Sequence, residues 1–295
     1  MGKVHSGRVI AHFGKSWAVE DETGRICLCN ALRRLDQPCV GDRVHWEQTD
    51  GEHGRIVQVL PRKTLLVRPA RGGKLRPTAA NVEQVFIVIA PQPQYDLLLV
   101  DQYLVVCENR GIAPVILFNK IDLIDNRKVM EIELKPYLEL YPFHYLSAKT
   151  GEGMKTLKSL MRGKTSMLAG QSGVGKSSLL HWLVPDKDIR VGELSRGTQR
   201  GRHTTTTAML FHLPEGGDLI DTPGVAVFGL ADIDERRLAW GYKEFRPHIP
   251  RCRFNDCRHV NDQGCAVREA VQQGKIDKGR YLRYLKLREK LPKIS

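Results

Sequence analysis

A glycine-rich stretch in the middle of the chain has the spacing of a phosphate-binding loop. Residues 170–177 read Gly-Gln-Ser-Gly-Val-Gly-Lys-Ser and fit G-x-x-x-x-G-K-[ST], between an apolar segment and a helix-like one. In such loops backbone N–H groups surround phosphate oxygens, the lysine neutralises the β- and γ-phosphates, and the serine hydroxyl binds Mg²⁺. The predicted phosphate-side residues are Gly170, Gln171, Ser172, Gly173, Val174, Gly175, Lys176, Ser177 and Ser178.

A second motif, earlier in the chain, indicates which base is bound. Residues 119–122 read Asn-Lys-Ile-Asp, match N-K-x-D and follow the apolar segment 114–118, as expected at the carboxyl end of a strand in an open α/β sheet. A carboxylate at Asp122 accepts hydrogen bonds from guanine N1–H and the 2-amino group together, and adenine lacks that pair of donors. A weaker signal, Ser-Ala-Lys at 147–149, suits a loop whose backbone contacts guanine O6. The predicted guanine-side residues are Asn119, Lys120, Asp122, Ser147 and Ala148.

Residues 221–224 read Asp-Thr-Pro-Gly and match D-x-x-G behind a strand-like segment. Asp221 is expected to hold Mg²⁺ through water, and the Gly224 N–H to face the γ-phosphate. An isolated Asp-Thr-Pro-Gly would be only a turn, but its place behind a strand and after the phosphate loop favours the nucleotide site. The polar residues 201–207, Gly-Arg-His-Thr-Thr-Thr-Thr, suit a switch loop in which one threonine completes the Mg²⁺ shell.

Four potential metal ligands lie close together near the C-terminus, in the spacing C-x₄-C-x-H-x₅-C. Three thiolates and one imidazole fill the tetrahedral shell of Zn²⁺ and leave no position for water, so one structural zinc is predicted, with buried thiols as the alternative. The predicted ligands are Cys252, Cys257, His259 and Cys265. The remaining cysteines lie in strand-like or helical patterns and are expected to pack: Cys27, Cys29, Cys39 and Cys107.

The elements around these motifs predict a multidomain fold. Turn residues separate five short strand-like segments, which suggests a small closed barrel, either an OB-fold or an SH3-like barrel. The segments are 8–13, 16–20, 25–29, 42–47 and 54–60. Apolar, amphipathic and apolar segments then follow in a βαβ rhythm. We predict an all-β OB-like barrel at 1–67, a linker at 68–79, an α/β P-loop GTPase domain at 80–232 and a zinc-binding helical domain at 233–295.

The charge balance is compatible with a polyanionic partner but does not by itself select one. The chain has 46 Lys and Arg against 33 Asp and Glu, a net charge of +13, which attracts RNA, DNA or an anionic membrane, although solvated lysine faces give the same count. The basic residues of segment 275–293 are interleaved with Tyr281 and Tyr284, which suits either RNA or a helix whose apolar face docks on the GTPase domain. With no apolar run of about 18 residues and no signal-peptide pattern, a cytoplasmic protein that does not bind membranes is expected.

The order of the nucleotide motifs is unusual, because the guanine motif precedes the phosphate loop, the switch threonines and D-x-x-G. This order resembles the circularly permuted GTPases, and with the flanking domains nearly the whole chain resembles the ribosome small-subunit-dependent RsgA/YjeQ family. The resemblance implies that Thr205 is the switch ligand of Mg²⁺. It also implies that the partner is the small ribosomal subunit with its rRNA, during late maturation.

The residue after D-x-x-G is Val225, where Ras-like enzymes have a glutamine that orients the attacking water. Valine can neither donate nor accept there, so slow intrinsic turnover and strong activation by the partner are expected. Hydrophobic replacement is similar to what the permuted families show, and His203 is the candidate to position water, unless it only packs or caps its loop. The predicted catalytic residues are His203, Lys176 and Thr205.

The motifs predict a GTPase, and the resemblance implies that it binds the small subunit in its GTP state, is activated by it and leaves after hydrolysis. The cofactors are GTP, Mg²⁺ and one Zn²⁺, and a monomer is the default. An alternative from a different class is an RNA-binding module that uses GTP as a regulatory ligand with incidental hydrolysis. A permuted GTPase of the large subunit also stays open, although the flanking barrel and zinc unit disfavour it.

Overall fold

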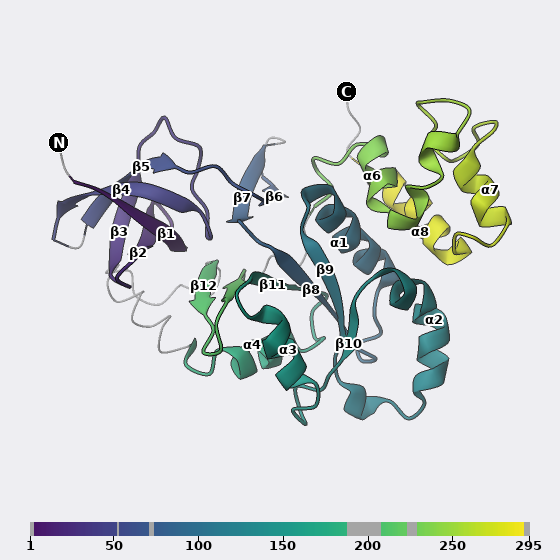
Figure 1. The fold of residues 1–295 in the computed structure, drawn as a ribbon, viewed down its shortest axis with the longest axis horizontal. Coiled ribbons are helices and arrows are strands. Elements are labelled where there is room, and N and C mark those ends of the chain that lie inside the picture. Colours follow the sequence, from purple (N-terminus) through teal and green to yellow (C-terminus); the bar gives the residue numbers. More distant parts are fainter. Residues whose placement is uncertain (1–2, 52, 71–73, 188–207, 223–228, 292–295) are drawn as a thin grey trace. The chain divides into compact units, whose positions relative to one another are not determined.

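The computed structural model describes residues 3–51, 53–70, 74–187, 208–222 and 229–291 (Figure 1). The chain forms two compact units, each assembled from separate stretches of sequence. The first unit contains 1–84, 154–168 and 177–226, and the second contains 85–153, 169–176 and 227–295. None of the described helices has the length and apolar character needed to cross a membrane.

The N-terminal part of the first unit is a closed five-stranded barrel, as the sequence predicts. Its strands are β1 (Val4–Phe13), β2 (Ser16–Asp21), β3 (Ile26–Ala31), β4 (Arg43–Asp50) and β5 (His53–Val59). They pair in the order β1-β2-β3-β5-β4, and β1–β4 pairing closes the ring. Only β3 and β5 run parallel among these five strands. Alternate residues face a core of Val9, Trp17, Val19, Cys27, Cys29, Val44, Trp46 and Ile56.

A β-hairpin occupies most of the segment for which the sequence indicates a linker at 68–79. Strand β6 (Leu65–Pro69) pairs antiparallel with β7 (Leu75–Ala80). Ala79 and Ala80 are fully buried, whereas Arg68, Pro69 and residues 74–76 are exposed. Small buried alanines and exposed arginines and prolines carry little apolar periodicity, which is why the sequence pattern did not indicate these strands.

The rest of the first unit carries the strand that ends in Asp221. Strand β13 (Asp218–Asp221) pairs antiparallel with β12 (Met209–His212) and parallel with β11 (Thr165–Ala169). Strand β12 also pairs with β1 of the barrel through Ala11 and Met209. Helix α3 (Met154–Met161) precedes β11, and α4 (Lys176–Leu183) follows the phosphate loop.

Three strands of the second unit are neighbours in the order β10-β9-β8. They are β8 (Gln84–Ile89), in which every residue is buried, β9 (Ala113–Phe118) and β10 (Phe143–Tyr145), with β9 and β10 parallel. The predicted βαβ segment is present, with α1 (Leu97–Arg110) between β8 and β9. A short helix η2 (Ile121–Leu123) and α2 (Arg127–Leu140) follow β9.

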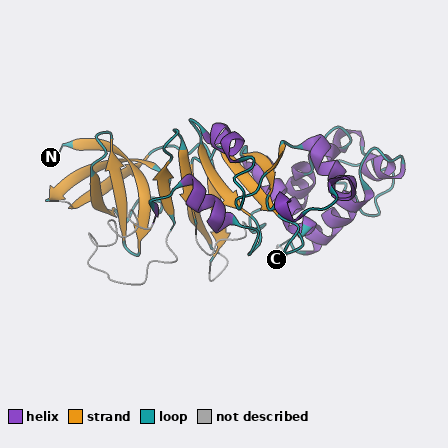
Figure 2. Ribbon diagram, turned by 90° about the horizontal axis from the view of Figure 1, so that it is seen from below, coloured by secondary structure: helices purple, strands orange, loops and turns teal. Residues whose placement is uncertain are grey.

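The C-terminal part of the second unit is helical, and residues 229–291 contain no strand (Figure 2). Its elements are α6 (Glu235–Gly241), η3 (Lys243–Phe245), η4 (Ile249–Arg251), α7 (Ala266–Gln272) and α8 (Lys278–Glu289). Helix α1 packs against α6 and α8. The basic tail helix α8 is therefore docked on the α/β part of its own unit, the second of the two arrangements expected for it.

Candidate nucleotide and zinc sites

The backbone of the phosphate loop requires its glycines. Gly170, Gly173 and Gly175 have φ angles of 141°, 83° and 97°, which residues other than glycine rarely adopt. A Cβ atom at Gly170 would lie 2.3 Å from the carbonyl oxygen of Val88, and one at Gly175 would lie 2.3 Å from Nδ2 of Asn119. The loop is thus closely packed against β8 and the guanine motif, and its shape depends on the absence of side chains.

Two of the polar side chains of this loop, those of Lys176 and Gln171, are held by backbone atoms. Lys176 begins α4, and its Nζ donates to the carbonyl oxygens of Gly170 and Gln171, both at 2.6 Å. The side chain of Gln171 accepts from the Asp96 N–H at 3.0 Å and donates to the Gln94 carbonyl at 2.9 Å. The segment before α1 thereby supports the phosphate loop. Ser177 and Ser178 are exposed on the first turn of α4.

Asn119 joins the three motifs that lie in the second unit. Its buried side chain donates from Nδ2 to the Val174 carbonyl of the phosphate loop at 2.8 Å. Its Oδ1 accepts from the backbone N–H of Ala148 at 3.0 Å. Segments that are far apart in the sequence therefore meet at one amide.

Asp122 is held in its ionised form. The Ser147 hydroxyl donates to Oδ1 at 2.5 Å, and Nζ of Lys149 lies 3.8 Å from Oδ2. The hydrogen bond from Ser147 is the main cause that lowers the pKa of Asp122, and the charge of Lys149 adds to it. An ionised carboxylate is the form that accepts both guanine donors. Lys120 adopts a φ of 62° and donates from Nζ to the carbonyl oxygens of Gln92 and Gly173, each at 2.7 Å.

Asp221, the first residue of D-x-x-G, is the last residue of β13 and lies opposite Met209 of β12. Its Oδ2 forms an ion pair with Nζ of Lys187 at 2.6 Å. Lys187 was not among the predicted site residues, because a lysine in a polar segment is common. His203, Thr205, Gly224 and Val225 lie outside the described residues.

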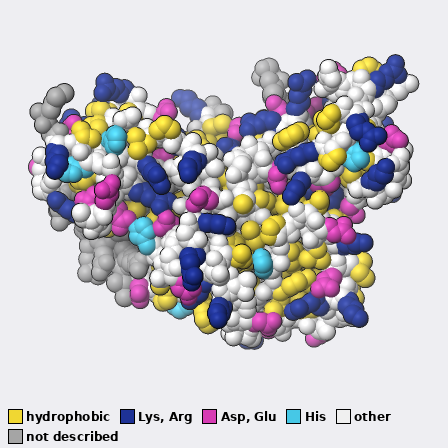
Figure 3. Space-filling view, in the orientation of Figure 1, with side chains coloured by type: hydrophobic (Ala, Val, Ile, Leu, Met, Phe, Trp, Pro, Cys, Tyr) yellow, Lys and Arg dark blue, Asp and Glu magenta, His cyan; other side chains and the backbone are white. Residues whose placement is uncertain are grey.

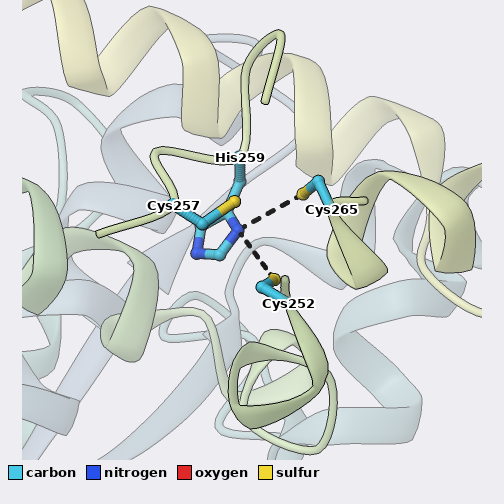
Figure 4. A group of neighbouring side chains, drawn as sticks. All are labelled: Cys252, Cys257, His259 and Cys265. Carbon is cyan, nitrogen blue, oxygen red and sulfur yellow. Dashed lines mark hydrogen bonds between the residues drawn. The ribbon is translucent and has the colours of Figure 1, made fainter. Parts of the chain in front are cut away.

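The four predicted zinc ligands gather in one cluster (Figure 4). One ligand atom from each of Cys252, Cys257, His259 and Cys265 lies within 4.8 Å of all the others. Nδ1 of His259 is 3.6 Å from Sγ of Cys252 and 3.4 Å from Sγ of Cys265. Tetrahedral Zn²⁺ with bonds of about 2.3 Å to sulfur and about 2.0–2.1 Å to nitrogen sets these ligands about 3.5 Å apart. The residues therefore fit a Cys₃His zinc site in both identity and spacing.

The protonation chemistry of the cluster also suits a metal. Burial lowers the pKa of His259, which keeps the imidazole neutral and able to coordinate through Nδ1. Burial raises the pKa of Cys257 to about 12 and raises that of Cys265. Because a bound cation stabilises thiolates, metal binding here must release protons.

Helix α8 holds the loop that carries these ligands. The Tyr281 hydroxyl donates to the His259 carbonyl at 2.7 Å, and the Tyr284 hydroxyl donates to the Arg258 carbonyl at 2.8 Å. His259 itself has a φ of 58°, so the loop turns sharply there. The tyrosines that the sequence placed among basic residues as a possible RNA-binding pattern thus bond inside their own unit.

Much of the charge of α8 is also neutralised internally, which the sequence did not indicate. Arg280 is buried and binds Asp101 of α1 at 2.5 Å and Glu244 of η3 at 2.7 Å. Arg283 binds the second oxygen of Asp101 at 2.8 Å. In the described part of this tail, up to residue 291, the exposed lysines are Lys275, Lys278, Lys286 and Lys290. On the face drawn in Figure 3, basic side chains are interspersed with acidic ones.

Comparisons with known proteins agree with these motifs. The model of the RsgA GTPase family matches residues 59–231. The chain is 45% identical to the small ribosomal subunit biogenesis GTPase RsgA of Hahella chejuensis, over 97% of this chain and 84% of that protein. The crystal structure of YjeQ from Thermotoga maritima is 35% identical, with a TM-score of 0.77 and 98% of both chains covered. YloQ, a circularly permuted GTPase, is 27% identical, with a TM-score of 0.75 over 98% of this chain and 95% of that one.

Proposed function

The chain belongs to the RsgA GTPase family, and from this premise we propose that it hydrolyses GTP while assisting the late maturation of the small ribosomal subunit. The observation that carries the proposal is the meeting of the guanine motif, the Ser-Ala-Lys loop and the phosphate loop at Asn119. The hydrogen bonds of Asn119 hold the guanine motif beside the phosphate loop, which supports one site that binds both the guanine base and the phosphates. We infer the partner, the small ribosomal subunit, from the relatives that are named small ribosomal subunit biogenesis GTPases.

We propose that separate groups of residues bind the guanine base, the phosphates and Mg²⁺. Asp122 accepts from guanine N1–H and the 2-amino group, and its lowered pKa keeps it able to do so. The N–H groups of residues 170–176 and the Lys176 ammonium hold the phosphates. Ser177, Thr205 and Asp221 would hold Mg²⁺, which when bound offsets negative charge on the phosphate oxygens.

We infer that hydrolysis depends on the partner. A water molecule attacks the γ-phosphate in line, and Lys176 stabilises the charge that develops there. Val225 offers no group to orient that water, so we assign this task to His203 once the small subunit is bound. A positioned general base of this kind contributes about 10²- to 10⁴-fold in rate, which sets the expected scale of activation.

The remaining parts are assigned to docking and stability. The closed barrel, with its one parallel pair β3–β5, supports an OB-fold that binds rRNA. The Cys₃His cluster is proposed to hold one structural Zn²⁺ without an open position for water. We further propose that the protein is cytoplasmic and monomeric, and that its barrel, GTPase and zinc parts act as three functional domains.

Co-sedimentation with isolated ribosomal subunits tests the docking step. At one fixed salt concentration, the full chain with a non-hydrolysable GTP analogue is expected to sediment with small subunits but not with large ones, and GDP should release it. Lys176→Ala, which removes the phosphate-binding ammonium, should abolish the difference between the two nucleotides. Equal binding to both subunits in both nucleotide states would instead support an RNA-binding module in which GTP is incidental.

A further inference from the structure

The carboxylate of Asp221 is already engaged by a cation of the chain itself. Nζ of Lys187 lies 2.6 Å from Oδ2 of Asp221, and both side chains are partly buried, at 29% and 24% exposure. The same ammonium lies 5.9 Å from the centre of the Phe211 ring, over its face. Two neighbouring strands, β12 and β13, therefore each contribute one contact to Lys187.

The position of Lys187 is fixed by its backbone as well. Its N–H donates to the Val184 carbonyl at 3.2 Å, and the Val184 N–H donates to the Leu180 carbonyl at 2.8 Å. This turn continues from α4, the helix that begins at the phosphate-loop lysine Lys176. The ammonium is thus delivered to Asp221 by the same element that follows the phosphate loop, which distinguishes the pair from a contact between two mobile surface side chains.

We propose that Lys187 is a positioning residue that opposes Mg²⁺ at Asp221 and so raises the Mg²⁺ concentration at which the nucleotide site fills. The inference rests on the proposed function, in which Asp221 holds Mg²⁺. A magnesium ion held through Asp221 would meet the Lys187 ammonium at the same carboxylate, and two cations within a few ångströms repel. Lys187 also cancels the single negative charge that Asp221 offers to the metal.

The test measures Mg²⁺ affinity rather than turnover. Mg²⁺ held by the chain and the phosphates together would slow nucleotide release, so the release rate of a fluorescent GDP analogue from the full chain is followed as Mg²⁺ is titrated. Lys187→Met, which keeps the aliphatic stem and removes the charge, is expected to lower the half-maximal Mg²⁺ concentration about tenfold. Lys187→Gln should do the same, and it serves if the methionine variant folds poorly. Lys187→Arg, which keeps the charge, should resemble the wild type.

Lys158→Met is the matched control, because Lys158 forms a comparable pair with Glu215 at 3.2 Å in the same unit. It should leave the Mg²⁺ dependence unchanged. If Lys187 served stability alone, its loss would weaken Mg²⁺ binding or leave it unchanged. An unchanged or higher half-maximal Mg²⁺ concentration in both uncharged variants therefore overturns the proposal.

Asp221→Asn distinguishes a failure of the role of Lys187 from a failure of the assignment of Asp221 to Mg²⁺. If it raises the half-maximal concentration while the Lys187 variants change nothing, only the role of Lys187 fails; if it changes nothing, the assignment of Asp221 fails and the proposal with it.

Discussion

Replacing Arg280 should loosen the attachment of α8 to the rest of the second unit. Its side chain is 1% exposed, and its guanidinium contacts Asp101 and Glu244 and lies 5.0 Å from the Tyr137 ring centre and 4.8 Å from that of Tyr242. Arg280→Met keeps most of the volume but removes the charge. Asp101 would still be bound by Arg283 and by the Tyr137 hydroxyl at 2.6 Å, whereas Glu244 would keep no ion pair among the described residues.

The magnitude follows from the charge that is left behind. Removing one partner of a buried ion pair costs about 3–5 kcal/mol, and because Asp101 keeps other partners we expect the lower end, about 3 kcal/mol. Removing the orphaned charge as well, in Arg280→Met with Glu244→Gln, should recover at least about 1 kcal/mol. Lys135→Met is the control, because Lys135 and Glu139 form a pair at 3.7 Å that is exposed on both sides, and it should cost less than about 1 kcal/mol.

Hydrogen exchange is the suitable assay, because a chain with two units need not unfold in one step. In peptides that cover α1 and α8, Arg280→Met should lower amide protection by about 100-fold or more, since each 1.4 kcal/mol changes protection about tenfold. Protection in the barrel should not change. If Arg280→Met costs no more than Lys135→Met, or if the double variant is less stable than the single one, the reasoning about the buried charges is refuted.

Three further predictions concern other parts of the molecule. Asp122→Asn should weaken GTP binding about 100-fold or more in competition assays and should favour xanthosine triphosphate, whose C2 carbonyl accepts from the new amide; unchanged GTP preference would contradict the guanine assignment. Cys257→Ser should reduce zinc content measured by atomic emission and lower helical circular dichroism, and a chelator should do the same to the wild type but change the variant less. The pKa of His212 is raised to about 9, chiefly by hydrogen bonds to Asp218 and then Glu20, so the stabilisation from protonated His212 is complete below about pH 6.5 and lost as the pH rises through 9. Because the ring is half exposed, the free energy of unfolding of the wild type should fall by at most about 1 kcal/mol over that range. Denaturant unfolding of His212→Asn should not show this fall.

The barrel strands could be predicted from sequence because their information is local. Glycines and other turn residues separate short apolar segments there. The predicted bounds of β2, β3 and β5 lie within two residues of the observed ones, whereas β1 begins four residues earlier and β4 ends three residues later than predicted. The phosphate loop and the guanine motif were identifiable for a similar reason, since each is a short pattern beside an apolar strand. The hydrogen bonds through which Asn119 joins these motifs were found only in the structure.

Contacts between distant residues could not be predicted in this way. The basic residues of the tail can be counted in the sequence, but Arg280 finds its partner Asp101 179 residues earlier. The ion pair of Lys187 with Asp221 likewise joins two residues that no local pattern connects. The amino-acid composition does not distinguish a basic residue that forms an ion pair inside the fold from one that is free to bind a polyanion. The packing of α8 shows which of its basic residues form internal ion pairs.

The small ribosomal subunit is expected to stimulate GTP hydrolysis by this protein, and the rate of hydrolysis under matched conditions tests this most directly. Purified protein alone, and with small subunits, large subunits or bulk RNA, is assayed for GTP hydrolysis at one salt concentration. We predict an intrinsic rate of roughly 10⁻⁴ to 10⁻³ s⁻¹ and a rise of at least about 100-fold with small subunits only, lost in His203→Ala that still binds GTP. Equal rates in all four mixtures would contradict the claim and leave a GTP-binding protein whose hydrolysis is incidental.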